Sequence, residues 1–298
     1  ISGTYPGFVG FVASKLFGLP YVTMAHGNEF LRFKNRPLLR TAIRYVFNKS
    51  RAVLAVSGYV GEQLNRFGVR PEKISVVFNG VDTEQFSPAE PVAMETLKEK
   101  LQITDKSFVL LTVSRLDRRK AHLNVLEAVK ELGAAIPSFE QDAVYLIGGT
   151  GPEQENILGY IREHSLEHLA RYIGFVEDAD LPVLYSISDL LIMPSVYLED
   201  EGNVEGFGLV YLEAGACGTP SIGGNVGGAV DAVENGVTGY VVDGKNVEQI
   251  KEKVDSLYTN REVLQELGRN AYNRSTTQFE ITAICEKELG YVAGAAVT

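Results

Sequence analysis

Residues 203–228 read NVEGFGLVYLEAGACGTPSIGGNVGG, and the rest of the chain is organised around them. Seven residues separate Glu205 from Glu213 in this stretch. Gly206 and Gly208 follow the first glutamate, and apolar residues at helical spacing follow the glycines. This pattern predicts a glycine-rich turn that leads into a helix, with Glu205 at the mouth of the helix and Glu213 about two turns inside it.

The start of this predicted helix is suited to bind an anion. The first amides of a helix have no intrahelical acceptor, and its N-terminus is electropositive, so a diphosphate fits there. Glycines carry no Cβ, which lets a ligand approach the backbone closely. Carboxylates are good acceptors for hydroxyl groups. Glutamates on both sides of a phosphate site therefore predict a ligand with a polyol at each end, such as a nucleotide sugar.

Four motifs, in this order along the chain, resemble those of retaining glycosyltransferases of family 4, which have the GT-B fold. They are MAHGNEF, which contains His26; VVFNGVDTEQF; SRLDRRKAH, which contains Arg115 and Lys120; and EGFGLVYLEAGACGTP, which contains both glutamates. The likeness extends over most of the chain. The wording NVEGFGLVYLEA is closest to bacterial mannosyltransferases that act on phosphatidylinositol mannosides.

The resemblance implies a role for each matching residue. Glu205 contacts the transferred sugar and orients it without becoming a covalent nucleophile, and a phosphate oxygen accepts the proton of the acceptor. Glu213 binds the ribose hydroxyls. The implied catalytic residues are His26, Glu205, Arg115 and Lys120. The implied donor-binding residues are Arg115, Lys120, Gly206, Phe207, Gly208, Leu209 and Glu213.

No Asp-x-Asp motif lies near these residues, so we expect neither a metal nor another cofactor, with the cations and the helix N-terminus in the metal's place. Two positions depart from the family pattern: Ala121 stands where glycine is usual, and Asp231 where glutamate is more frequent. The stretch GGNVGG, residues 223–228, would let backbone amides meet the donor.

Strand and helix patterns alternate along the chain, which predicts an α/β protein with two Rossmann-like domains and parallel sheets. We expect a first domain at 1–85, a linker at 86–106, a second domain at 107–277 and a C-terminal helix and tail at 278–298. Strands are predicted at 21–25, 52–56, 74–78, 108–113, 143–147, 172–176, 190–194, 220–223 and 239–242. Only three strands precede the linker and residue 1 is not Met, so we expect the first domain to be truncated at its N-terminus.

Composition narrows the functional classes. The 298 residues carry a formal net charge of −10, which argues against nucleic acid as a general partner. Two cysteines make no disulfide framework, and the chain shows neither a long apolar run nor a signal peptide, so we expect a cytoplasmic protein.

One basic segment stands out against the acidic chain. Residues 30–61 contain seven basic residues and no acidic ones. Arg36, Arg40 and Arg44 repeat every fourth residue along a predicted helix at 37–50. This stripe is either a contact surface for an anionic membrane or a phosphorylated acceptor, or a solvated face over a packed core.

The predicted function is transfer of a mannose- or glucose-type hexose from a GDP- or UDP-hexose to a lipid-linked or saccharide acceptor. A nicotinamide dehydrogenase is disfavoured, because GGTGPE at 148–153 lacks the third glycine of the dinucleotide fingerprint. Two alternatives stay open: a sugar-nucleotide epimerase, and a shortened, non-catalytic partner subunit that binds nucleotide sugar.

Overall fold

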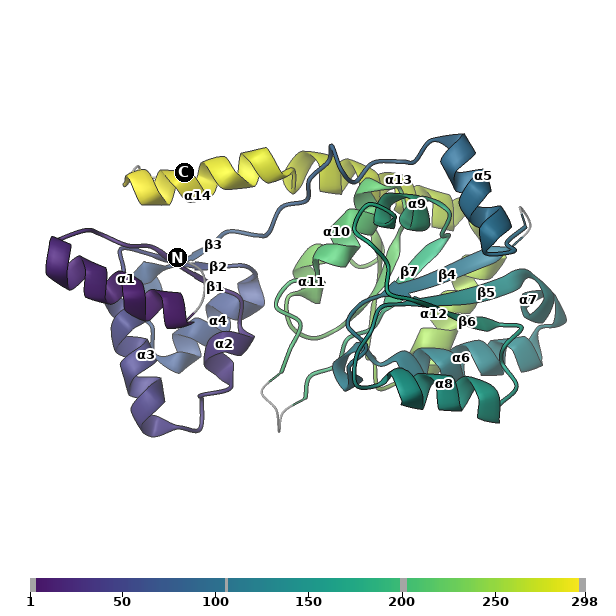
Figure 1. The fold of residues 1–298 in the computed structure, drawn as a ribbon, viewed down its shortest axis with the longest axis horizontal. Helices are drawn as coiled ribbons and strands as arrows, with labels where there is room; N and C mark the ends of the chain where they lie inside the picture. The colour runs from purple at the N-terminus through teal and green to yellow at the C-terminus, as the bar shows by residue number, and fades with distance from the viewer. Residues whose placement is uncertain (1–3, 105–106, 199–202, 295–298) are drawn as a thin grey trace.

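The computed structural model describes residues 4–104, 107–198 and 203–294. They form two domains side by side, each built on a parallel β-sheet (Figure 1). The GT-B architecture predicted from the sequence is confirmed.

The first domain contains a three-stranded sheet in the order β1-β2-β3. Its strands are short and parallel, with Thr23 opposite Val53 and Val53 opposite Ile74. β1 and β2 are buried or half-buried, whereas β3 ends in the exposed Val76. The three strands predicted before the linker are present. The elements of this domain are α1 (Thr4–Phe17), β1 (Thr23–Ala25), α2 (Asn28–Leu31), α3 (Pro37–Lys49), β2 (Val53–Ala55), α4 (Gly58–Phe67) and β3 (Ile74–Val76).

The second domain contains a six-stranded parallel sheet in the order β6-β5-β4-β7-β8-β9. All six residues of β5 are buried, as expected of a strand covered on both faces. The six strands predicted after the linker are present: β4 (Phe108–Val113), β5 (Ala143–Gly148), β6 (Ala170–Gly174), β7 (Leu190–Met193), β8 (Ser221–Gly224) and β9 (Gly239–Val242).

Helices cover both faces of this sheet. In Figure 1, α6 and α8 lie on one side and α9, α10 and α13 on the other. The bounds are α6 (His122–Ala135), α7 (Pro137–Asp142), α8 (Gln154–Glu163), α9 (Leu181–Ser186), α10 (Leu209–Ala216), α11 (Ala229–Ala232), α12 (Val247–Thr259) and α13 (Arg261–Gln278).

The strand order reverses beside β4. The chain first adds β5 and β6 on one side of β4, and then β7, β8 and β9 on the other. Loops that leave adjacent strands in opposite directions open a crevice at their carboxyl ends, where ligands of such sheets bind. The loops after β4 and β7 meet at this point.

Several predicted elements differ from the structure. β6 begins and ends two residues before the predicted strand 172–176, and α7 was not predicted at all. α10 is only eight residues long, so Glu213 lies just over one turn from its start and not two. The C-terminal helix expected within 278–298 begins only at Ile281, because α13 continues to Gln278 and α14 (Ile281–Ala293) follows it.

The chain crosses between the domains twice. The first crossing includes α5 (Pro91–Lys100), within the predicted linker. The second places α14 on the first domain, where Ile284 packs with Ala52, Leu54 and Val77. Figure 1 shows α14 extending over the first sheet. The first domain thus contains the final helix of the described chain.

Candidate functional site

Glu205 is the centre of a buried charged cluster. Its Oε2 accepts hydrogen bonds from Lys120 Nζ at 2.6 Å, from Arg119 Nη1 at 2.7 Å and from Ser195 Oγ at 3.2 Å. Lys120 and Arg119 belong to the loop after β4, whereas Ser195 and Glu205 follow β7. The cluster therefore lies at the reversal point of the sheet and joins its two loops.

The opposite charges of this cluster stabilise one another. Burial on its own would raise the pKa of Glu205, but Lys120 and Arg119 outweigh burial and bring that pKa to about 2. Burial lowers the pKa of Lys120, and Glu205 opposes this change. A buried ion is costly without a partner. Asp117 Oδ2 lies 3.9 Å from Arg119 Nη2 and adds a second carboxylate, so two cations and two carboxylates balance each other in this cluster.

The glycines after Glu205 allow a tight turn at the domain boundary. A Cβ on Gly206 would lie 2.3 Å from the carbonyl oxygen of His26, at the end of β1. Gly208 has a φ of +94°, and a Cβ there would lie 2.4 Å from the ring of Tyr211. The turn thus brings the backbone of His26, in the first domain, against Gly206, three residues before α10 begins.

The side chain of Phe207 points into the protein core, unlike a side chain that would contact the donor. Its side chain is buried and lies in an aromatic cluster, with ring centroids 5.8 Å from both Phe78 and Phe279. Only its backbone is left to meet a donor. The next predicted donor contact, Leu209, is 41% exposed at the first position of α10.

A cavity of about 580 Å³ adjoins the start of α10. Arg115 lines it, together with Ser114, Gly149, Phe175, Tyr185 and Glu213. Glu213 Oε2 accepts a hydrogen bond from the Tyr185 hydroxyl at 2.8 Å, and burial raises the pKa of Glu213. Arg115 and Glu213 therefore share one cavity, whereas the Lys120 side chain lies in the adjacent cluster with Glu205.

The sequence analysis missed two residues that follow β4: Arg119 in the loop and His122 at the start of α6. Arg119 pairs with Glu205, but it precedes the lysine of the motif and looks like one of several surface cations. His122 Nε2 lies 3.2 Å from Ser114 Oγ. Burial, with a smaller contribution from Lys120, lowers the pKa of His122 to about 4, so its ring stays neutral at physiological pH.

The glycine-rich stretch after β8 packs against the central turn. Gly228 N donates to the carbonyl oxygen of Glu205 at 2.8 Å, and a Cβ on Gly227 would lie 2.1 Å from the same oxygen. The Gly228 amide is therefore engaged within the protein. Asp231, which follows, accepts a hydrogen bond from Gly58 N of the first domain at 3.0 Å.

Arg40 and Arg44 of the predicted basic stripe lie on α3, whereas Arg36 directly precedes this helix in an extended conformation. Arg36 and Arg44 are exposed, while Arg40 is half-buried and donates to the Arg66 carbonyl oxygen at 3.2 Å.

A metal site would require at least three His, Cys, Asp or Glu side chains close together, and no such group occurs within the described ranges. No helix in the part of the chain that the structure describes is long and apolar enough to cross a membrane.

Two parallel α/β domains that meet at such a crevice define the GT-B class of glycosyltransferases. The comparison with protein families agrees: residues 93–274 match the family "Glycosyl transferases group 1", and residues 1–85 match "Glycosyltransferase Family 4". The chain belongs to this glycosyltransferase family.

Named relatives and solved structures support the same assignment. The chain is 31% identical, over 79% of its length, to the GDP-mannose-dependent alpha-(1-6)-phosphatidylinositol monomannoside mannosyltransferase of Mycolicibacterium smegmatis, of which it covers 60%. It is 28% identical to N-acetyl-alpha-D-glucosaminyl L-malate synthase of Bacillus anthracis, with 90% of the chain and 67% of that protein covered. Anabaena Alr3699/HepE in complex with UDP superposes with a TM-score of 0.86 at 22% identity, over 98% of this chain and 77% of that one.

Proposed function

We propose that this chain is a retaining glycosyltransferase that moves a mannose- or glucose-type hexose from a GDP- or UDP-hexose to a lipid-linked or saccharide acceptor, without a metal ion. The observation that carries the proposal is the Glu205 cluster, held ionised between Lys120 and Arg119 beside the N-terminus of α10. The mannosyltransferase relative, which is named for GDP-mannose, supports the hexose class.

The two glutamates divide the donor between them. Glu213 faces the 580 Å³ cavity and would accept hydrogen bonds from the ribose hydroxyls. Glu205, at the other end of the turn, would accept them from the hydroxyls of the sugar. The diphosphate would lie between them, against Arg115 and the first amides of α10. Arg115 and the electropositive start of α10 would then provide the positive charge that a metal ion would otherwise supply.

In the proposed step, the bond between the sugar C1 and the diphosphate oxygen breaks. The acceptor hydroxyl oxygen forms a bond with C1 on the same face, and its proton passes to an oxygen of the departing nucleoside diphosphate. Glu205 Oε2 already accepts three hydrogen bonds, which suits a carboxylate that orients the sugar better than one that attacks it. His26 approaches from the first domain, where the acceptor would bind.

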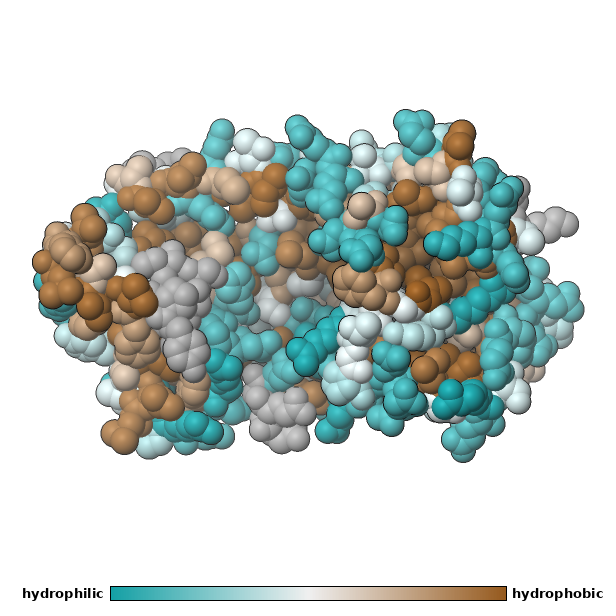
Figure 2. Space-filling model, in the orientation of Figure 1, coloured by the Kyte–Doolittle hydropathy of each residue, from teal (hydrophilic) through white to brown (hydrophobic). Residues whose placement is uncertain are grey.

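A lipid-linked acceptor is supported by the outer surface of the first domain. Figure 2 shows apolar side chains gathered over α1 and one end of α3. Val9, Leu16, Phe17 and Leu38 are each at least 69% exposed there. The exposed Arg44 lies on α3 as well, and the exposed Arg36 directly precedes it. Apolar and basic side chains together suit peripheral contact with the anionic inner face of a membrane.

Calorimetric titration with GDP, UDP and ADP tests the donor assignment. We expect micromolar-range binding of GDP or UDP, and a weaker interaction with the matching nucleoside. No binding at millimolar concentration would overturn the proposal.

The chain spans 58% to 68% of the length of the curated mannosyltransferase relatives that it matches. The second candidate function is a non-catalytic subunit that binds nucleotide sugar. To distinguish the enzyme from the non-catalytic subunit, the protein is incubated with membrane lipids and with the hexose derivative of the nucleotide that it binds. A product with retained anomeric configuration, read by NMR, identifies the enzyme. Binding without any transfer identifies the subunit.

A further inference from the structure

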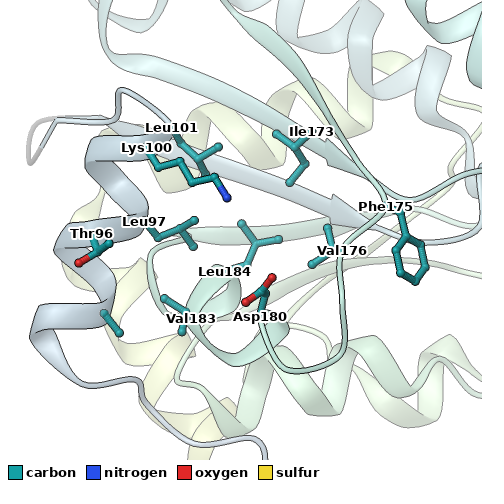
Figure 3. Close-up of a pocket in the computed structure, with 11 residues that line it drawn as sticks. Thr96, Leu97, Lys100, Leu101, Ile173, Phe175, Val176, Asp180, Val183 and Leu184 are labelled. Atoms are coloured by element: carbon teal, nitrogen blue, oxygen red, sulfur yellow. The ribbon is translucent and has the colours of Figure 1, made fainter.

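A second cavity, of about 420 Å³, lies between α5 and the second domain. Its walls come from α5, from the end of β6 and the loop after it, and from α9 (Figure 3). The lining is mainly aliphatic and includes Leu97, Leu101, Ile173, Val176, Val183 and Leu184. Its volume is within the range of small-molecule sites, which are mostly apolar with a few polar groups.

Two charged side chains also line this cavity. Figure 3 shows the ammonium of Lys100, from α5, and the carboxylate of Asp180, from the start of α9, both directed toward the space between the walls. Among the residues that the structure describes, neither side chain forms an ion pair. The neighbouring Lys98, by contrast, pairs with Glu95 at 3.1 Å. Lys100 is therefore available to an anionic group that enters the cavity.

The second cavity shares a wall with the proposed donor cavity. Phe175 and Val176 line both of them. Helix α9 also separates the two: Leu181 and Tyr185 face the donor cavity, while Val183 and Leu184 face the second one. Because Tyr185 holds Glu213 by a hydrogen bond of 2.8 Å, a shift of α9 reaches a residue of the donor site.

We propose that the second cavity is an effector site for a small amphipathic anion, a molecule with an aliphatic body and a single carboxylate or phosphate head. The head binds Lys100, the aliphatic body fills the space between α5 and α9, and a hydroxyl on the body can donate to Asp180. A bound ligand orders the segment around Phe175 and Val176, and this ordering strengthens nucleotide binding in the adjacent donor cavity. Ordering by one ligand reduces the entropy that a second one must lose.

Apolar lining and charge together select this class of ligand. A nucleotide would need several cations or a helix N-terminus for its phosphates, and Lys100 is the one basic residue among those that line the cavity. A fully apolar molecule would leave Lys100 and Asp180 unused. A short aliphatic acid matches both the wall and the cation.

Decanoate is the probe for the binding test, and the chain's lack of tryptophan makes a site-specific reporter possible. In the Phe175→Trp variant, titration with decanoate should shift the tryptophan emission, and the shift should saturate as the site fills. Adding Lys100→Met should weaken decanoate about threefold to tenfold, the effect of losing one partly exposed charge-assisted hydrogen bond. Lys98→Met, on the same helix, should leave the affinity unchanged. Decanol, which lacks the charge, should bind both lysine variants equally.

A variant that fills the cavity, Ala93→Phe, should abolish the signal for decanoate and decanol alike. No saturable signal, or equal losses in Lys100→Met and Lys98→Met, would overturn the site. Coupling is measured as the affinity of the wild-type chain for GDP or UDP with and without decanoate. We expect at least a twofold gain, and by linkage the nucleotide should strengthen decanoate by the same factor. An unchanged nucleotide affinity would overturn the effector role, whereas failure of any nucleotide to bind would count against the proposed function and not against this site.

Discussion

Lys120 Nζ lies 2.6 Å from Glu205 Oε2, and this ion pair joins the loop after β4 to the loop after β7. Both side chains are at most 12% exposed. Neither charge would be stable at this depth without the other. The catalytic glutamate implied by the sequence is therefore also a structural residue, and its replacement has effects on folding that must be separated from effects on transfer.

Glu205→Gln should lower the free energy of unfolding by about 3 kcal/mol, because it leaves the buried Lys120 without its carboxylate and Arg119 with only the more distant Asp117. Without Glu205, burial lowers the pKa of Lys120 further below its ordinary value of 10.5. The folded chain then releases a proton that the unfolded chain keeps, so the variant should gain stability as the pH rises toward 10.5. Urea unfolding at neutral and at alkaline pH measures both effects. Glu248→Gln, on an exposed pair with Lys251, is the matched control and should change stability by less than about 0.5 kcal/mol.

Glu213→Gln should weaken nucleoside diphosphate binding about tenfold, since a neutral amide accepts the ribose hydrogen bonds less strongly than a carboxylate. Glu205→Gln should leave that affinity nearly unchanged and reduce transfer by orders of magnitude. Calorimetry and a transfer assay on the same two preparations give the comparison. Identical profiles for the two variants would show that the division of roles is wrong.

Arg115→Met should weaken binding of the diphosphate about tenfold or more while leaving the nucleoside unaffected, because charge-assisted hydrogen bonds contribute about 1.5–3 kcal/mol. Lys120→Met should show the same preference through the charge of the cluster. Arg118→Met serves as the control in the same loop, since Arg118 does not line the donor cavity. Equal losses for nucleoside and diphosphate would place the phosphates elsewhere.

Gly206→Ala should hold the domains apart, because the added Cβ would lie 2.3 Å from the His26 carbonyl oxygen. Both contacting atoms belong to the backbone, one in each domain, so we expect the clash to be relieved by separation of the domains. Small-angle X-ray scattering should then give a larger radius of gyration. Gly159→Ala, on α8, has no atom within 4 Å of the added Cβ and should leave the scattering unchanged. A compact Gly206→Ala protein would mean that the turn adjusts within its own domain.

Wild-type protein should co-sediment with anionic but not neutral vesicles, and salt should release it. A triple variant, Arg36→Glu, Arg40→Glu and Arg44→Glu, should stay in the supernatant. Arg40 already donates to the Arg66 carbonyl oxygen, so the double variant at Arg36 and Arg44 should lose most of the binding. Wild-type protein that remains in the supernatant at low salt would favour a soluble acceptor.

The number and type of strands could be predicted because parallel strands read as short apolar runs between turn signals, as β5 does. The place of Glu205 beside the helix start was predictable from its glycines. Its partner Arg119 was not, because a contact between residues 86 positions apart depends on how two loops meet. Phe207 shows the opposite case: its place in the motif predicts a donor contact, whereas packing against Phe78 and Phe279 takes up its side chain.

The two chain crossings between the domains run side by side, and this contact has a mechanical consequence. Val81 N donates to the Phe279 carbonyl oxygen at 2.7 Å, and Ile281 N donates to the Val81 carbonyl oxygen at 3.0 Å. Two covalent connections tied together at one point act as a hinge, whose axis passes near Val81. Rotation about it would move His26 away from Gly206, while Phe78 and Phe279, whose rings meet edge to face close to the axis, would change little. Opening for substrate exchange would thus be a swing of the first domain together with α14, and not a sliding of one sheet past the other.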